Sequence, residues 1–159
     1  MLTRKKNITL TAIVILLAAV VISGCSSSSG AKNDSLVTPT NGKLAIPVAS
    51  VNDGQAHHFQ ALASDGTLVH FFVLKSSDGI IRAAIDSCDV CYRSGLGYYQ
   101  DGDYMICKNC GQKFASAKIN EIRGGCNPAP LNRTVVGNNL VITMQDIDLN
   151  SWYMKYRKA

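Results

Sequence analysis

The sequence CDVCYRSGLGYYQDGDYMICKNCG, residues 88–111, carries two Cys-x-x-Cys pairs on either side of a short polar segment. Fifteen residues separate Cys91 from Cys107, a spacing typical of metal–thiolate sites. A CxxC turn, or knuckle, points two sulfur atoms at one place while backbone N–H groups donate to them. Two such knuckles on adjacent β-hairpins close a tetrahedron of thiolates. The sequence therefore predicts a two-knuckle, zinc-ribbon-like metal site with the ligands Cys88, Cys91, Cys107 and Cys110.

The residue after each pair refines this prediction. Gly111 directly follows the second pair, at a position that often needs a backbone conformation easy for glycine. Tyr92 stands at the corresponding place after the first pair, so the second pair is the better match to a knuckle. A c-type haem would require histidine at these two places. Haem attachment is therefore excluded.

A fifth cysteine, Cys126, leaves three interpretations open: a further ligand of a cluster, a disulfide partner, or a free thiol. Disulfides are also the alternative for the four CxxC cysteines, because exported thiols meet an oxidising space. Five cysteines cannot all pair within one chain, however, which favours metal. A thiol–disulfide enzyme is a third alternative, although no thioredoxin-like βαβ pattern surrounds either pair.

The surrounding sequence predicts a mainly β, small α+β fold built from hairpins. Asp-Gly pairs flanked by apolar runs indicate tight turns, and a Gly-Asn pair near the end predicts one more hairpin. A terminal helix is expected over residues 145–156, and residues 116–122 are ambiguous. The predicted strands are residues 44–51, 56–62, 67–74, 80–85, 98–99, 104–106, 133–136 and 139–143.

The N-terminus has the layout of a bacterial lipoprotein signal peptide. Three basic residues, 4–6, precede an uncharged and mostly apolar run, residues 8–22. This run is short for a transmembrane helix, which needs about 20 apolar residues. The sequence ISGC, residues 22–25, resembles a lipobox, in which cleavage leaves an N-terminal cysteine that is then acylated. An ordinary signal peptide and a retained anchor helix are the alternatives.

Three regions are therefore expected: residues 1–24 as the signal peptide, residues 25–41 as the lipidated Cys25 with a flexible Ser-rich tether, and residues 42–159 as the Cys-rich metal-binding domain. Several acyl chains on one cysteine suffice for stable anchoring. We expect a protein lipid-anchored to the inner or outer membrane of the cell envelope and facing the extracytoplasmic side. Of 16 basic residues, three precede Cys25, so the mature chain carries +2, which is too mild to indicate nucleic-acid binding.

The motifs CDVCY, CKNCGQKF, INEI and GGCNPAPL, with the Phe71-Phe72 pair and the Asp-Gly turn that precede them, fall within residues 71–131. This stretch resembles the FtrD-like family of membrane iron–sulfur proteins, whose Cys-rich domain is often attached to, or encoded beside, iron permeases. The resemblance implies iron or an iron–sulfur cluster as cofactor, with electron transfer or redox handling of iron as the role. It implies an iron permease or a redox protein as partner. The cofactor-binding positions that it implies are Cys88, Cys91, Cys107, Cys110 and Cys126.

The N-terminal sequence MLTRKKN contains no twin-arginine pair, which argues against export of a folded, pre-loaded protein. Iron–sulfur clusters are normally built in the cytoplasm, and export of an unfolded chain would lose one. A single ion acquired outside avoids this difficulty. Zinc, mononuclear iron and copper(I) therefore stay open. The alternative function is a structural-zinc or copper-binding module for protein interaction or metal delivery.

Other residues give no sign of an enzyme active site. His57, His58 and His70 lie in predicted strands, where packed or half-exposed side chains are the simplest interpretation. The sequence contains no nucleophile elbow, phosphate loop or paired carboxylates in a convincing context. A hydrolase is therefore excluded, and an electron carrier or metal-binding protein is expected.

Overall fold

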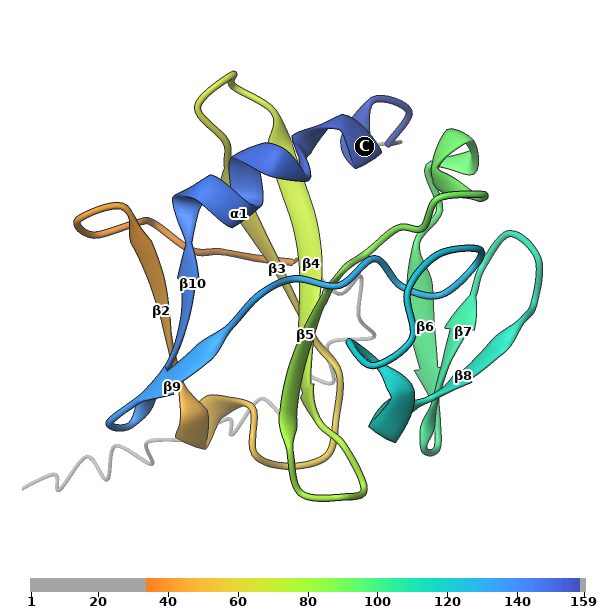
Figure 1. Cartoon of the computed structure of the whole chain (residues 1–159), viewed down its shortest axis with the longest axis horizontal. Coiled ribbons are helices and arrows are strands. Elements are labelled where there is room, and N and C mark those ends of the chain that lie inside the picture. The colour runs from red at the N-terminus through yellow and green to blue at the C-terminus, as the bar shows by residue number, and fades with distance from the viewer. Residues whose placement is uncertain (1–33, 158–159) are drawn as a thin grey trace, which may run out of the picture. The chain divides into compact units, whose positions relative to one another are not determined.

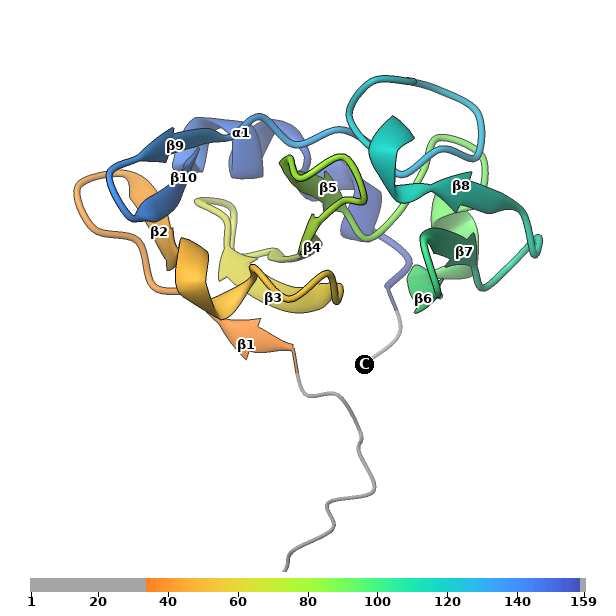
Figure 2. The ribbon, with the colours of Figure 1, turned by 90° about the horizontal axis from the view of Figure 1, so that it is seen from below.

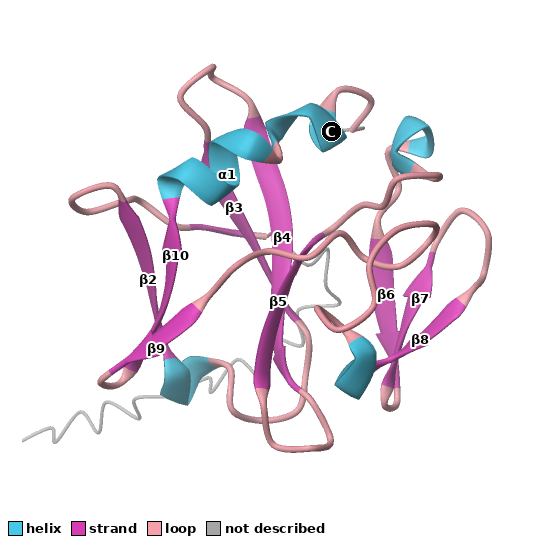
Figure 3. Cartoon of the chain, viewed as in Figure 1, coloured by secondary structure: helices cyan, strands magenta, loops and turns pink. Residues whose placement is uncertain are grey.

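The computed structural model describes residues 34–157, and the expected signal peptide and lipidated Cys25 lie outside these residues. Ten strands dominate the described part of the chain, with one short α-helix and four single-turn 3-10 helices (Figure 3). The prediction of a mainly β fold with a small helical content is confirmed. No helix within the described residues is long and apolar enough to cross a membrane.

A four-stranded sheet forms the middle layer of the domain (Figure 1). Its strand order is β1-β3-β4-β5, with β1 parallel to β3 and the other pairs antiparallel. The turns before and after β4 contain Gly66 and Gly79, both at φ +84°, which explains the Asp-Gly pairs there. The strands are β1 (Ser35–Leu36), β3 (His57–Leu62), β4 (Leu68–Lys75) and β5 (Ile81–Ile85).

A three-stranded antiparallel sheet, ordered β2-β10-β9, lies on one side of the middle layer (Figures 1 and 2). It consists of β2 (Lys43–Pro47), β9 (Thr134–Val136) and β10 (Asn139–Thr143). The helix α1 (Met144–Leu149) follows β10 directly and is capped by Thr143, whose Oγ1 accepts the N–H of Asp146 at 3.1 Å. The 3-10 helix η4 (Ser151–Met154) continues toward the C-terminus.

A second three-stranded antiparallel sheet, ordered β6-β7-β8, lies on the other side and carries the second CxxC pair (Figure 1). Its elements are β6 (Tyr98–Asp101), β7 (Tyr104–Cys107) and β8 (Lys113–Ala115). The 3-10 helix η2 (Tyr92–Ser94) precedes this sheet and η3 (Ser116–Lys118) follows it.

Two hydrophobic clusters cover the two faces of the middle sheet. Along β4, Phe71 and Val73 belong to the cluster shared with β2, β10 and α1. Phe72 and Leu74 belong to the cluster that contains Cys88, Cys91 and Cys107. Successive side chains of a strand point to opposite faces, so this one strand supports both the fold core and the cysteine cluster.

Three expected boundaries differ from the structure. The strand expected over residues 44–51 ends at Pro47, which lacks an N–H for a ladder, and η1 (Val48–Ser50) follows. The terminal helix is interrupted at Asn150, whose side chain donates to the Asp146 carbonyl at 2.7 Å and competes with the helix backbone. The tether expected through residue 41 is too long, because β1 already pairs with β3.

Candidate metal centre

The first CxxC pair occupies the loop after β5. The N–H of Cys91 donates to Cys88 Sγ at 3.1 Å, and the N–H of Tyr92 donates to the Cys88 carbonyl at 3.1 Å. The chain then enters η2, which ends at Gly95 with φ +67°. Cys88 and Cys91 therefore sit in a closed turn although no glycine follows the second cysteine.

The second CxxC pair connects β7 to β8. Cys107 is the last residue of β7, and its N–H donates to the Gln112 carbonyl at 3.0 Å. Gly111 has φ +73° and donates its N–H to the Cys107 carbonyl at 2.9 Å. The left-handed glycine expected after this pair is present. The Lys108 N–H donates to the Gly97 carbonyl at 2.9 Å, which ties this knuckle to the segment that follows the first one.

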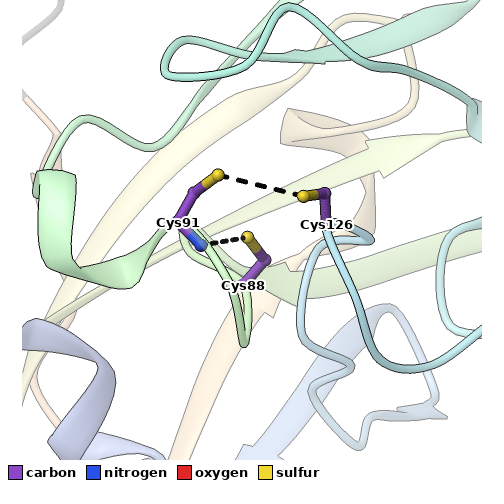
Figure 4. Close-up of side chains that lie close together, drawn as sticks. All are labelled: Cys88, Cys91 and Cys126. Carbon is purple, nitrogen blue, oxygen red and sulfur yellow. Dashed lines mark hydrogen bonds between the residues drawn. The ribbon is translucent and has the colours of Figure 1, made fainter.

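Cys126 comes from the long loop between η3 and β9. This loop runs along β5, where the Ile85 N–H donates to the Ala129 carbonyl at 2.8 Å and the Ala129 N–H donates to the Ser87 carbonyl at 2.9 Å. The Tyr98 hydroxyl donates to the Cys126 carbonyl at 2.7 Å. These bonds place Cys126 opposite the first knuckle, as Figure 4 shows.

The five sulfur atoms form two overlapping groups. Within each group all ligand atoms lie within 4.8 Å of one another: one group is Cys88, Cys91 and Cys126, and the other is Cys91, Cys107 and Cys110. All five side chains are free thiols. Four thiolates around one ion with metal–sulfur bonds of about 2.3 Å are about 3.8 Å apart. Small movements of these sulfur atoms are therefore sufficient to enclose a metal.

The sequence model of the family described as "Membrane iron-sulfur containing protein FtrD-like" matches residues 51–154. The match contains every strand from β3 to β10 and all five cysteines described above. The chain belongs to the FtrD-like family. The resemblance seen in residues 71–131 is therefore confirmed and extended in both directions along the chain.

Other comparisons add little to the FtrD-like assignment. No curated protein matches the sequence at a significant level. A solved structure described as the quaternary ammonium Rieske monooxygenase CntA, in complex with an inhibitor, superposes with a TM-score of 0.45 and 11% sequence identity. The superposition covers 65% of this chain and 31% of that one, so this chain spans about a third of its length. A similarity of this degree indicates neither a shared function nor a shared cofactor.

The donor set of this FtrD-like protein fits iron and iron–sulfur centres. Thiolate sulfur is the ligand that iron–sulfur clusters use most, and four thiolates in a tetrahedron also suit a single iron or zinc ion. The two groups together offer five sulfur atoms, one more than a tetrahedral ion takes. Cys91 belongs to both groups, so it is the residue that connects the two candidate sites.

Burial and hydrogen bonds give Cys91, Cys107 and Cys110 different acidities. Burial raises the pKa of Cys91 to about 11 and that of Cys107 to about 12, despite hydrogen bonds that lower both. The backbone N–H of Gln112 lowers the pKa of Cys110, which is exposed. The raised pKa values of Cys91 and Cys107 favour their protonated forms at neutral pH, so a metal bound by these two thiols has to displace their protons.

One residue near the sulfurs, Asn109, was not identified from the sequence. The Asn109 side chain donates to Cys91 Sγ at 3.2 Å from inside the second knuckle. Tyr98 is 1% exposed, and its N–H donates to Asp86 Oδ1 at 2.7 Å while its hydroxyl bonds the Cys126 carbonyl. The only sequence signal for Asn109 is its place between Cys107 and Cys110. Of the tyrosines near the knuckles in sequence, Tyr98 is buried and can shield the sulfur atoms from water. Tyr99 and Tyr104 are exposed and cannot shield them.

The histidines lie outside both sulfur groups within the described residues. His57 Nε2 lies 2.8 Å from Asp53 Oδ1, and His70 Nδ1 lies 2.5 Å from Asp34 Oδ2. His58 faces the buried Asp86, with 3.7 Å between Nδ1 and Oδ2. These carboxylate contacts agree with the expectation that the histidines are ordinary strand residues.

Proposed function

We propose that this FtrD-like protein is an extracytoplasmic, lipid-anchored electron carrier that binds iron or an iron–sulfur centre through its cysteine cluster and serves iron uptake as a redox accessory. The observation that carries the proposal is the convergence of five free thiols from three separate loops into two groups that share Cys91. Cys88, Cys91, Cys107, Cys110 and Cys126 would hold the centre. When bound, the centre supplies reversible one-electron chemistry.

The burial of the cluster supports electron transfer rather than storage of metal. Cys88, Cys91 and Cys107 are at most 9% exposed, and they pack among Phe72, Leu74 and Met105. Cys110 is exposed and opens the second knuckle to solvent. Apolar surroundings exclude water and set the potential, while the exposed edge leaves a short path to a docked partner. The described part of the chain offers no comparable cluster elsewhere.

The lipobox-like residues 22–25 support anchoring at a membrane surface, and membership of a membrane family agrees with this location. The partner we propose is an iron permease or a membrane redox protein, whose electrons would pass through the cluster. An accessory role follows because the chain contributes thiol ligands and an anchor, and neither by itself moves iron across a bilayer.

The test is anaerobic purification of the full-length protein from membranes, followed by elemental analysis, acid-labile sulfide, visible absorption and EPR. We expect stoichiometric iron, visible colour and a redox-dependent EPR signal, all strongly reduced in Cys107→Ser. Acid-labile sulfide would identify a cluster, and its absence a mononuclear iron site. A colourless protein without iron would overturn the proposal.

A structural-zinc or copper module is the second candidate, because tetrahedral thiolates suit zinc and thiolates suit copper(I). The same samples decide between the two. Zinc or copper at about one ion per chain, with no iron, would replace electron transfer by a role in protein interaction or metal delivery.

A further inference from the structure

The C-terminal segment presents a row of exposed apolar and aromatic side chains. Leu149 is 65% exposed, Trp152 is 49% exposed and Tyr156 is 39% exposed. Leu149 ends α1, Trp152 is in η4, and Tyr156 follows η4. The Tyr92 ring lies 5.3 Å from the Trp152 ring and 5.8 Å from the Tyr156 ring, which shows that both converge beside η2.

Two cations accompany these rings. The Arg93 guanidinium lies 5.8 Å from the Tyr92 ring centre and 5.9 Å from that of Tyr156. Lys155 Nζ lies 5.6 Å from the Tyr156 ring centre. Within residues 34–157, neither Arg93 nor Lys155 forms an ion pair with a carboxylate. The surface is therefore aromatic and positively charged, and we name Arg93, Leu149, Trp152, Lys155 and Tyr156 the aromatic patch.

The acidic residues next to this segment are held by other partners. Asp148 accepts the backbone N–H of Ser64 at 2.8 Å, and Asp146 accepts from Asn132 at 2.8 Å. Asp89 accepts the hydroxyl of the buried Tyr153. Each of these carboxylates accepts a hydrogen bond from a neutral group of the protein, and within the described residues none of them pairs with Arg93 or Lys155.

The described chain begins close to the aromatic patch. Asp34 and Arg157 line one cavity of about 180 Å³, and Arg157 directly follows Tyr156. Asp34 comes nine residues after Cys25, and a chain of that length spans at most about 30 Å. This reach is close to the diameter of a domain of about 100 residues. Acylation of Cys25 would therefore hold the domain within about one domain diameter of the bilayer, which is close enough for the aromatic patch to reach it.

We infer that the aromatic patch rests on the surface of a membrane that carries anionic headgroups. Tryptophan and tyrosine prefer the membrane–water interface, and lysine and arginine near an anionic leaflet are attracted to it. Tyr92 belongs to the same aromatic group and directly follows Cys91, so this contact would set the orientation of the cysteine cluster toward the membrane. The argument from the tether rests on the lipid anchor of the proposed function. The argument from the aromatic and basic side chains of the patch does not depend on that anchor.

The test uses Trp152, which is the only tryptophan in the chain. Its fluorescence is measured for the full-length protein in vesicles of phosphatidylcholine and phosphatidylglycerol, with and without brominated acyl chains. We expect a blue shift, quenching by the brominated lipids and protection from acrylamide. Equal acrylamide access in vesicles and in lipid-free buffer, with no quenching by brominated lipids, would overturn the inference.

Charge variants test whether the positive charge of the patch itself binds the membrane. The double variant Arg93→Glu/Lys155→Glu should weaken binding to the anionic vesicles about tenfold or more. The double variant Lys43→Glu/Lys118→Glu changes the net charge equally at exposed residues on other elements and should bind like the unchanged protein. Equal weakening by both double variants would indicate a mere effect of net charge and would overturn the role of the patch.

The lipid anchor and the patch can be separated. Residues 34–157 contain both hydrophobic clusters, so a chain without residues 1–30 can be tested alone. Mass spectrometry of the full-length protein reports acylation of Cys25, and vesicle binding of the shortened chain reports the patch. Protection of Trp152 in native membranes but not in vesicles of the same lipids would assign the patch to a protein partner and overturn the inference.

Discussion

Cys91 Sγ and Cys126 Sγ lie 3.9 Å apart, although the two residues are 35 positions apart in the sequence. The approach depends on the loop that carries Cys126, which is hydrogen-bonded along β5 and held by the Tyr98 hydroxyl. Cys91 also belongs to the group that contains Cys107 and Cys110. One thiol therefore links the first knuckle, the second knuckle and the Cys126 loop.

The shared position of Cys91 predicts unequal effects of cysteine substitution. Cys91→Ser removes a ligand from both sulfur groups, so we expect metal affinity to fall at least 100-fold. Cys110→Ser removes an exposed ligand from one group, and Cys126 remains as a fifth sulfur. We expect a smaller loss, of the order of 10-fold, as for changes next to a metal site. Competition with a chelator measures both affinities, and equal losses would show that the two groups do not act as one site.

The hydroxyl of Tyr98 predicts a second effect. Tyr98→Phe removes the 2.7 Å hydrogen bond to the Cys126 carbonyl without leaving a cavity. The loss of a hydrogen bond is worth about 1 kcal/mol, or about fivefold in an equilibrium. We therefore expect metal release to a chelator to be several-fold faster.

Tyr99→Phe is the matched control for this experiment, since Tyr99 is 48% exposed on the neighbouring position of β6. It should leave the release rate unchanged. A Tyr98→Phe protein that releases metal at the original rate would mean that the Ala129 and Ser87 pairing alone holds the loop.

The sequence predicted what local chemistry determines. The Asp-Gly and Gly-Asn turns, the strands between them, and the left-handed Gly111 all follow from neighbouring residues, and the structure contains them. The start of the domain could not be predicted in this way, because the partner of β1 is β3, more than twenty residues away. From the sequence alone, Ser35 and Leu36 look like part of the polar tether. Only their pairing with β3 identifies them as a strand.

In the candidate metal site, too, some features follow from local sequence and others depend on tertiary packing. The CxxC spacing predicted that the two knuckles approach each other, but the expected adjacent hairpins are absent: only the second pair lies in a hairpin, between β7 and β8, and the first lies in the loop after β5. The place of Cys126 depends on the Ala84–Pro130 bridge and on the bonds of Ala129 along β5, and no local pattern encodes these. Asn109 is inside a predicted knuckle, but its direction toward Cys91 depends on how the knuckles pack. Tertiary packing thus determines which residues come to lie around the sulfur atoms.

Gly95 predicts a stability effect at the contact between η2 and the C-terminal segment. It has φ +67°, and a Cβ there would lie 2.0 Å from the Tyr156 carbonyl oxygen. Gly95→Ala must therefore displace the C-terminal segment as well as strain its own backbone. Gly66 has φ +84° with nothing within 4 Å of a Cβ, so Gly66→Ala tests the backbone strain alone.

We expect Gly66→Ala to lower the free energy of unfolding by about 1 kcal/mol and Gly95→Ala to lower it by at least about 2 kcal/mol more, as overpacking does. Urea denaturation followed by circular dichroism measures both. Trp152 fluorescence should also change in the Gly95 variant, because Trp152 packs near Tyr92 and Tyr156. Equal destabilisation by the two substitutions would show that the C-terminal segment does not depend on this contact.

The contact between Asp34 and His70 predicts the acid behaviour of the β1 edge. Burial raises the pKa of Asp34, but the hydrogen bond and the charge of His70, 2.5 Å away, hold it below its usual value of 3.8 overall. The folded state thus binds the proton of this carboxyl less readily than the unfolded state does. Its contribution to stability is present above about pH 4 and is lost as the pH falls through the lowered pKa.

Asp34→Asn should therefore lower the free energy of unfolding at pH 7 by about 1–3 kcal/mol, as for a hydrogen bond to a charged group. The difference from the unchanged protein should shrink as the pH falls below about 4. Asp101→Asn provides the control, since its contact with Lys113 is long, at 3.4 Å, and both side chains are exposed; it should cost less than about 1 kcal/mol. Denaturation curves between pH 3 and pH 7 measure both variants. A loss for Asp34→Asn that stays constant over this range would mean that the carboxylate charge contributes nothing and that only the shape of the side chain matters at the β1 edge.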